Sequence, residues 1–249
     1  MLIQSVVSIP KEWNFPEANE DCWMKSEDNI SFVISDGASE SFDSRFWAKV
    51  LCETFVNIVK RNQRNKFFRE INIKKLVVGA REKFNLTYNQ KTLTWSQEAS
   101  FKRGSFATIL GVIDHGSHLE IMAIGDSVAI WISGRVLKTL KIHQHYNFNA
   151  RPFLLSTLEK EDNNLFSNLQ INCNSEKIKK SNFDGGDLFL LTDALAETII
   201  RTEKTEGFDE AIKILKKNNS DLRAWVDYQK NSGLLKKDDY TLAWIKIYG

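Results

Sequence analysis

Carboxylates stand at the ends of apolar runs at several points of the chain, and these are the residues best placed for chemistry. The run Ile30–Ile34 leads into Asp36-Gly37, and Asp187–Thr192 leads into Asp193. An apolar, β-branched run predicts a strand, and Asp-Gly predicts the tight turn that ends it. A carboxylate at a strand end is held rigidly at the rim of a sheet, which suits a metal ligand. Taken alone, an Asp-Gly pair is more often only a turn.

Three further acidic sites flank predicted strands: Glu20-Asp21, Gly125-Asp126-Ser127 and Asp238-Asp239. Each of them could also be an ordinary solvated turn or a charged edge. A sheet can bring residues distant in sequence to one rim, and clustered carboxylates repel one another unless cations neutralise them. Ligation by oxygen alone selects Mg²⁺ or Mn²⁺. Two such ions that share a carboxylate would form a two-metal hydrolytic site.

The elements that must position these carboxylates follow from hydrophobic periodicity. Helical spacing predicts helices from about Phe42 to Val59, capped by Ser41 or Asp43, and from Ile73 to Gln90. Short runs with glycine-based turns predict an antiparallel meander over Gly104–Lys141. The remaining predictions are strands at the N-terminus, Cys22–Lys25, Asn168–Cys173 and Tyr240–Ile247, helices near Leu195, Phe208–Lys217 and Leu222–Gln229, and a loop over Lys91–Arg103.

Composition excludes several classes of function. The chain has 249 residues, 42% of them apolar, and a formal net charge of +2, which argues against a dedicated nucleic-acid surface. Its three cysteines are scattered, which is typical of reduced thiols in a cytoplasmic protein. No apolar run approaches the roughly 18–20 residues that span a bilayer, and the N-terminus lacks a basic segment of a signal peptide. We therefore expect a cytoplasmic protein with no membrane and no nucleic-acid partner. His143 and His145 indicate a loop rather than a transition-metal pair.

Six short motifs resemble, in order, those of the metal-dependent protein phosphatases, the type 2C serine/threonine family (PPM). They are Asn19-Glu20-Asp21, Asp36-Gly37, Gly104-Ser105-Phe106-Ala107-Thr108, Gly125-Asp126-Ser127, Thr192-Asp193-Ala194 and Asp238-Asp239-Tyr240-Thr241. No single motif is specific, but together they extend over nearly the whole chain. The sequence at residues 36–41 is most similar to the compact bacterial branch of that family.

The resemblance implies an α+β fold, a four-layer α-β-β-α sandwich of two antiparallel sheets flanked by helices, as a single domain over residues 1–249. By the same resemblance Asp36 would bridge two divalent cations, Mn²⁺ or Mg²⁺, and the carbonyl of Gly37 would bind the second. Asp193 and Asp238 would complete the first ion, while Glu20 and Asp21 would hold metal-bound water. Asp126 matches a turn aspartate that is largely structural. The mechanism implied is direct hydrolysis by a hydroxide that bridges the two ions.

The chain departs from the family pattern at several positions. Ala38 stands where many relatives have a histidine proposed to protonate the leaving group, and Pro16 stands where relatives often have a phosphate-binding arginine. For that arginine, Arg45, Arg103 and Lys25 are alternatives. The aspartate for a third ion would lie near His143–His145, where the sequence has none, so we expect two ions.

The function expected from the resemblance is a metal-dependent phosphoserine/phosphothreonine protein phosphatase. Its partners would be a phosphoprotein substrate and a cognate serine/threonine kinase in a bacterial signalling pair. One alternative is a catalytically weak or inactive pseudophosphatase that acts as a regulatory binding module; the absent histidine and arginine favour it, and the intact Asp36, Asp193 and Asp238 oppose it. The other alternative is a hydrolase of a phosphorylated small molecule, since substrate choice lies in surface loops.

Overall fold

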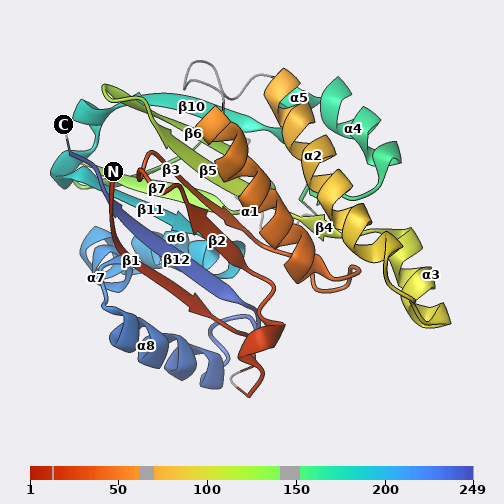
Figure 1. Cartoon of the computed structure of the whole chain (residues 1–249). Helices are drawn as coiled ribbons and strands as arrows, with labels where there is room; N and C mark the ends of the chain where they lie inside the picture. The colour runs from red at the N-terminus through yellow and green to blue at the C-terminus, as the bar shows by residue number, and fades with distance from the viewer. Residues whose placement is uncertain (13, 62–69, 141–151, 249) are drawn as a thin grey trace.

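The computed structural model describes residues 1–12, 14–61, 70–140 and 152–248. Two five-stranded sheets, both antiparallel, form the centre of the molecule (Figure 1). In the first sheet the strand order is β1 (Leu2–Ile9), β12 (Tyr240–Lys246), β11 (Asp187–Leu191), β7 (Val128–Ser133) and β8 (Val136–Thr139). In the second it is β10 (Asn174–Lys179), β6 (His118–Ile124), β5 (Ile109–Asp114), β3 (Ser31–Ser35) and β2 (Cys22–Lys25). A small ladder pairs β4 (Phe106–Ala107) with β9 (Leu155–Ser156).

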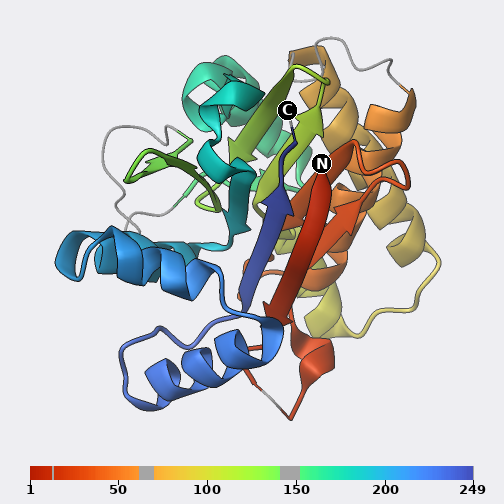
Figure 2. The ribbon, with the colours of Figure 1, turned by 90° about the vertical axis from the view of Figure 1, so that its left-hand side faces the viewer.

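Helices cover the outer face of each sheet (Figures 1 and 2). Over the second sheet lie α1 (Ser44–Arg61) and α2 (Glu70–Asn89), with α3 (Trp95–Arg103), α4 (Asp162–Ser167) and α5 (Leu169–Asn172) nearby. Over the first sheet lie α6 (Asp193–Thr205), α7 (Phe208–Leu215) and α8 (Asn219–Asn231). Four short 3₁₀ turns complete the described elements: η1 (Pro16–Ala18), η2 (Glu159–Glu161), η3 (Lys180–Asn182) and η4 (Asp184–Gly186).

The central strands are buried on both faces because each sheet has a neighbour on each side. In β3, Val33 packs under α1, while Phe32 and Ile34 pack into the apolar layer between the two sheets. In β11, Phe189 packs under α6, while Leu188 faces the layer between the sheets. Strands of this kind appear in the sequence as continuous apolar runs, and successive side chains supply two different cores. The predicted four-layer sandwich is therefore confirmed.

Most of the predicted elements are present, and the helix α1 begins where the sequence places its cap. The backbone N–H of Phe46 donates to Oδ1 of Asp43 at 3.2 Å, so Asp43, one of the two predicted caps, holds the first turn. The predicted meander is correct for β6, β7 and β8. The single strand expected over Ser105–Ile113 is instead divided at Thr108 into β4 and β5, which belong to different sheets, and the chain passes from the second sheet to the first between β6 and β7. The turn Gly125-Asp126-Ser127 is this crossing.

Two local predictions are wrong. Residues Lys91–Arg103 contain the helix α3 rather than only a loop, with a capping box in which Thr94 and Gln97 each accept from the other's backbone N–H. The strand expected over Asn168–Cys173 is instead the short helix α5, and the strand β10 begins after it. The histidines His143 and His145 lie outside the described residues. In the described ranges, no helix combines the length and apolar composition that a membrane crossing requires.

Candidate active site

Antiparallel pairing brings the acidic turns to one end of the sandwich. Asp36 follows β3, and Asp21 precedes β2, which runs antiparallel to β3. In the other sheet, Asp193 follows β11 and Asp238 precedes β12, which runs antiparallel to β11. Asp126 lies in the crossing between β6 and β7. In each sheet, a strand that ends at this rim is therefore paired with a strand that begins there. The two sheets place their aspartates opposite one another.

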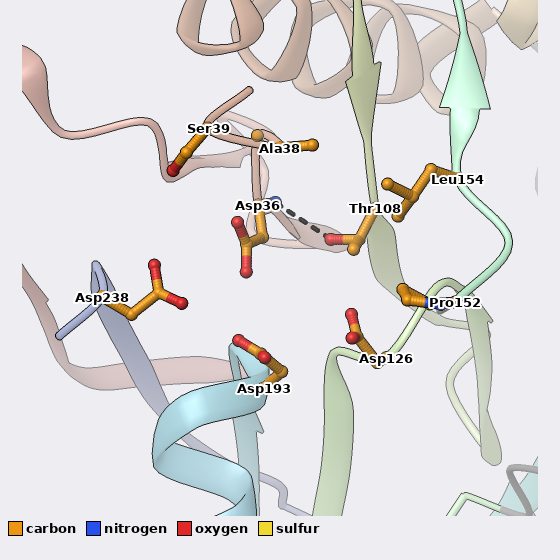
Figure 3. Close-up of a pocket in the computed structure, with 10 residues that line it drawn as sticks. Asp36, Ala38, Ser39, Thr108, Asp126, Pro152, Leu154, Asp193 and Asp238 are labelled. Atoms are coloured by element: carbon orange, nitrogen blue, oxygen red, sulfur yellow. Dashed lines mark hydrogen bonds between the residues drawn. The ribbon is translucent and has the colours of Figure 1, made fainter. Parts of the chain in front are cut away.

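A pocket of about 230 Å³ opens between these turns (Figure 3). It is lined by Asp36, Gly37, Ala38, Ser39, Thr108, Asp126, Pro152, Leu154, Asp193 and Asp238. The carboxylates of Asp36, Asp193 and Asp238 point toward one another across the pocket, as Figure 3 shows, and Asp126 lies on its other side. All four residues predicted as metal ligands thus line one pocket.

Asp36 is held in place by Thr108, a residue of one of the sequence motifs. The backbone N–H of Asp36 donates to Oγ1 of Thr108 at 3.0 Å, and the N–H of Thr108 donates to the carbonyl of Asp36 at 2.8 Å. Thr108 Oγ1 is also 2.9 Å from Oγ of Ser127, in the crossing between the sheets. These bonds fix the turn after β3 to both sheets.

Only glycine fits at position 37. A Cβ there would meet the backbone of Ser44 at 2.8 Å and the carbonyl oxygen of Glu20 at 2.9 Å. Both neighbours are main-chain atoms, so neither can move aside without shifting its segment. The close approach keeps the turn after β3 against the start of α1 and against the segment that carries Glu20 and Asp21.

The carboxylates of this rim repel one another. Burial, and then the charges of Asp21, Asp193 and Asp238, hold the pKa of Asp36 well above its ordinary value. Burial and the charge of Asp193 raise the pKa of Asp126 to about 7 and that of Asp238 to about 6. For Asp193, burial is the main cause of a raised pKa. The ionised forms of these four aspartates are therefore disfavoured unless positive charge is placed beside them.

Two buried oxygens at the rim have no partner within the described structure. They are Oδ1 of Asp21 and Oδ1 of Asp193. Such oxygens are costly to bury. Across the described ranges, no three Asp, Glu, His or Cys side chains are gathered closely enough to hold one ion as they stand. An all-oxygen, electron-rich and partly unsatisfied donor set fits a hard divalent cation.

Glu20 and Asp21, predicted to hold water, lie behind the pocket. Asp21 accepts hydrogen bonds from Oγ1 of Thr241 at 2.7 Å and from Oγ1 of Thr192 at 3.4 Å. Burial and three neighbouring aspartates raise its pKa well above the ordinary value, against the effect of the Thr241 bond. Both threonines belong to motifs beside Asp193 and Asp238, so they join the two acidic segments.

Glu20 has a different environment, which the sequence did not predict. It accepts from Nζ of Lys11, Oγ of Ser39 and Oγ of Ser44, each at 2.5 Å. Its own backbone N–H donates to Asp239 at 2.9 Å. Glu20 therefore ties the N-terminal segment to the turn after Asp36. No local pattern marks Lys11 or Ser39 for these contacts, because they depend on how the segments pack.

The basic residues considered for phosphate binding are not at the pocket. Arg45 donates to the carbonyl of Glu17, Arg103 to Ser100 and Lys25 to Asn29. None of the three lines the pocket. Among the described residues, Lys11 and Lys236 act electrostatically on the rim. Their direct ion pairs are with Glu20 at 2.5 Å and Glu197 at 2.7 Å.

Solved structures with the same fold are serine/threonine phosphatases. The phosphatase Stp1 from Staphylococcus aureus has 16% identity and a TM-score of 0.58, covering 100% of this chain and 96% of that one. PstP/Ppp from Mycobacterium tuberculosis has 12% identity and a TM-score of 0.58, with both chains fully covered. The catalytic domain of PstP in complex with two manganese ions has 12% identity and a TM-score of 0.52, with 100% of both chains covered.

A search of curated proteins gives no significant match. The family described as Protein phosphatase 2C matches residues 17–227. Two divalent metal ions are the cofactor of that family, as predicted, and PstP has been solved with two manganese ions. The family match spans most of the chain and every motif except Asp238–Thr241, so the protein belongs to the protein phosphatase 2C family.

Proposed function

We propose that this protein is a metal-dependent phosphatase that hydrolyses phosphoserine and phosphothreonine in a phosphoprotein substrate. One observation carries the proposal: four aspartates from both sheets line a single pocket, with raised pKa values and an orphaned buried oxygen. A pocket with this lining is suited to bind cations. The proposal takes residues 1–249 as a single phosphatase domain, and its counterpart is a serine/threonine kinase.

The residues that would hold two divalent cations, Mn²⁺ or Mg²⁺, are Asp36, the carbonyl of Gly37, Asp193 and Asp238. Bound cations would neutralise these carboxylates and lower the pKa of a water molecule to near neutrality. The chain's part is to fix the ligands. Thr108 anchors Asp36 through two hydrogen bonds, and Asp238 is held at the entry to β12.

Asp21 and Glu20 would serve the reaction from behind the ligands. The free Oδ1 of Asp21 is available to accept a hydrogen bond from water. Glu20, fixed by Lys11 and two serines, keeps Ser39 at the pocket wall. Among the described residues that line the pocket there is no histidine, and we propose that water protonates the leaving oxygen.

A second candidate is a pseudophosphatase that keeps the fold and binds a partner without turnover. The observation in its favour is that the pocket lining, as far as the described residues form it, contains neither histidine nor arginine. The two candidates differ in turnover, whereas both allow metal binding.

The test is hydrolysis of p-nitrophenyl phosphate and of a phosphothreonine peptide, with Mn²⁺, with Mg²⁺ and with EDTA. We expect Mn²⁺-dependent turnover in the wild type and a loss of about a hundredfold or more in Asp36→Asn. Asp209→Asn is the matched control, because Asp209 is an exposed aspartate of α7 whose pair with Arg135 contributes little.

Thermal unfolding with and without Mn²⁺ separates the outcomes. A ligand that binds only the folded state adds about 2.7 kcal/mol at one hundred times its dissociation constant. Stabilisation by Mn²⁺ without turnover on either substrate would favour the pseudophosphatase. If Mn²⁺ produces no stabilisation and the protein shows no turnover, the proposed metal site itself is overturned.

A further inference from the structure

Two of the three cysteines lie against each other, although they are 30 positions apart in the sequence. Cys22 opens β2, and Cys52 lies in the middle of α1, the helix that packs on that strand. Sγ of Cys52 donates to the carbonyl oxygen of Cys22 at 3.7 Å, and Sγ of Cys22 donates to the carbonyl oxygen of Trp23 at 3.9 Å. All three cysteines are free thiols.

The two thiols have unequal environments. Cys22 is half-buried, whereas Cys52 has no exposed surface. The adjacent Cys52 thiol and the nearby charges of Lys49 and Arg45 lower the pKa of Cys22, although burial and Glu53 oppose them. Burial holds the pKa of Cys52 well above its ordinary value. Cys22 is therefore the more nucleophilic and the more accessible thiol of the pair.

The third cysteine serves as an internal reference. Cys173 packs at the edge of the same apolar cluster and is also half-buried. Burial is the sole cause that raises its pKa to about 12. Among the described residues, no thiol or cation shifts the pKa of Cys173. Cys173 is therefore half-buried like Cys22 but lacks a neighbouring thiol there.

We propose that Cys22 and Cys52 form a modification site, a dithiol that hydrogen peroxide oxidises to an intramolecular disulfide. In the first step the Cys22 thiolate attacks one peroxide oxygen, the O–O bond breaks and hydroxide leaves, so that Cys22 becomes a sulfenic acid while peroxide is reduced. In the second step Sγ of Cys52 attacks the Cys22 sulfur. The S–O bond breaks, the hydroxide takes the Cys52 proton to give water, and the S–S bond forms.

The disulfide would join two segments that adjoin Glu20 and Asp21. Cys22 directly follows Asp21, and the charge of Asp21 acts on Cys52. Helix α1 begins with Ser44, which donates to Glu20 at 2.5 Å. Oxidation would thus tie β2 to α1 beside the acidic rim. The oxidation chemistry itself is independent of the proposed phosphatase activity, so it stands even if the protein has no turnover.

The experiment treats the folded full-length chain with hydrogen peroxide, then denatures it and alkylates the remaining thiols. We expect the alkylatable thiols to fall from three to one, the intact mass to lose two hydrogens, and a single linked peptide pair that contains Cys22 and Cys52. Dithiothreitol should restore all three thiols. Cys173→Ser is the matched control, in which the count should fall from two to none.

A second variant identifies the order of the steps. In Cys52→Ala the first step has no resolving thiol, so Cys22 should accumulate as a sulfenic acid that dimedone labels, while Cys173 remains unlabelled. The proposal is overturned if peroxide-treated wild type keeps three alkylatable thiols. It is equally overturned if Cys173 is oxidised as readily as Cys22, or if Cys22 proceeds to sulfinic acid without a disulfide.

Discussion

Strand β11 has an aspartate at each end, and the two carboxylates have opposite surroundings. Asp187 opens the strand and lies 2.6 Å from Nζ of Lys216 and 2.8 Å from Nζ of Lys246. It also accepts from Nε1 of Trp244 at 2.7 Å. Asp193 follows the strand at the other end, where its Oδ1 is buried without a partner in the described structure and its neighbours across the pocket are Asp36 and Asp238.

Burial raises the pKa of both aspartates, so the neighbours decide the outcome. Bonds from Lys216, Lys246 and Trp244 outweigh burial and lower the pKa of Asp187 below its ordinary value. The pKa of Asp193 stays raised. Within the described residues, lysines therefore pair directly with the carboxylate at one end of the strand, whereas at the other end the carboxylates face one another. The proposed function therefore predicts that Asp187 stabilises the fold, whereas Asp193 would bind a cation.

The largest expected effect is that of Asp193→Asn on activity. Removing a proposed ligand should lower Mn²⁺-dependent kcat/KM by about a hundredfold or more. In EDTA the same variant should be at least as stable as the wild type, because one of several repelling charges is gone. Hydrolysis of p-nitrophenyl phosphate and urea unfolding in EDTA measure the two effects.

Asp238→Asn is the companion variant and should show the same pair of effects, since burial and the charge of Asp193 raise its pKa to about 6. The comparison of Asp187 with Asp193 would be contradicted if metal-free Asp193→Asn were less stable than the wild type by more than about 1 kcal/mol. That result would mean that Asp193 stabilises the fold as Asp187 does.

The next effect is the cost of Asp187→Asn to stability. The substitution leaves Lys216 and Lys246 facing a neutral amide beside a buried strand. Removing one partner of a buried ion pair is strongly destabilising, but these lysines keep contact with water, so we expect about 2 kcal/mol. Urea unfolding at neutral pH measures it. Mn²⁺-dependent activity should be retained in the folded variant, and its loss would show that this end of the strand also serves the pocket.

Much of the fold could be predicted because its elements have local signals. Continuous apolar runs identified β3, β5 and β11, and helical spacing identified α1 and α2. The helix α3 was missed because its exposed surface carries no apolar stripe, although Thr94 and Gln97 formed a recognisable capping box. Over α5 the sequence Leu-Gln-Ile-Asn alternates like a strand, and four residues are too few to separate the two periods.

The acidic rim could be predicted for a similar reason. Each of its carboxylates adjoins a strand that is evident in the sequence, and antiparallel pairing then places them at one end. The contacts of Lys11 with Glu20 and Ser39 could not be predicted, because they join segments without a shared pattern. The sequence also could not show that Arg45, Arg103 and Lys25 do not line the pocket. Where these long side chains point depends on tertiary packing rather than on their spacing in the sequence.

The smallest expected effect concerns Asp114, at the end of β5 away from the rim. It accepts from the backbone N–H of Gly116 at 2.8 Å and pairs with Lys180 at 3.2 Å and the Met1 amino group at 3.0 Å. Burial alone would raise its pKa, but these bonds lower it. At neutral pH, Asp114→Asn should cost about 1 kcal/mol, since the pairs keep partial contact with water.

The pH dependence of that cost follows from the sign of the shift. A carboxylate whose pKa is lower in the folded state stabilises the fold fully above its ordinary pKa of about 4, and the stabilisation is lost as pH falls through the folded value. The difference in unfolding free energy between wild type and Asp114→Asn should therefore be constant from about pH 7 to pH 5 and vanish toward about pH 2. Urea titrations at several pH values measure it. A difference that persists unchanged in acid would show that Asp114 stabilises the fold through packing rather than through charge. Of the two aspartates compared at this end of the sandwich, only Asp187 would then be stabilised by its ion pairs with lysines.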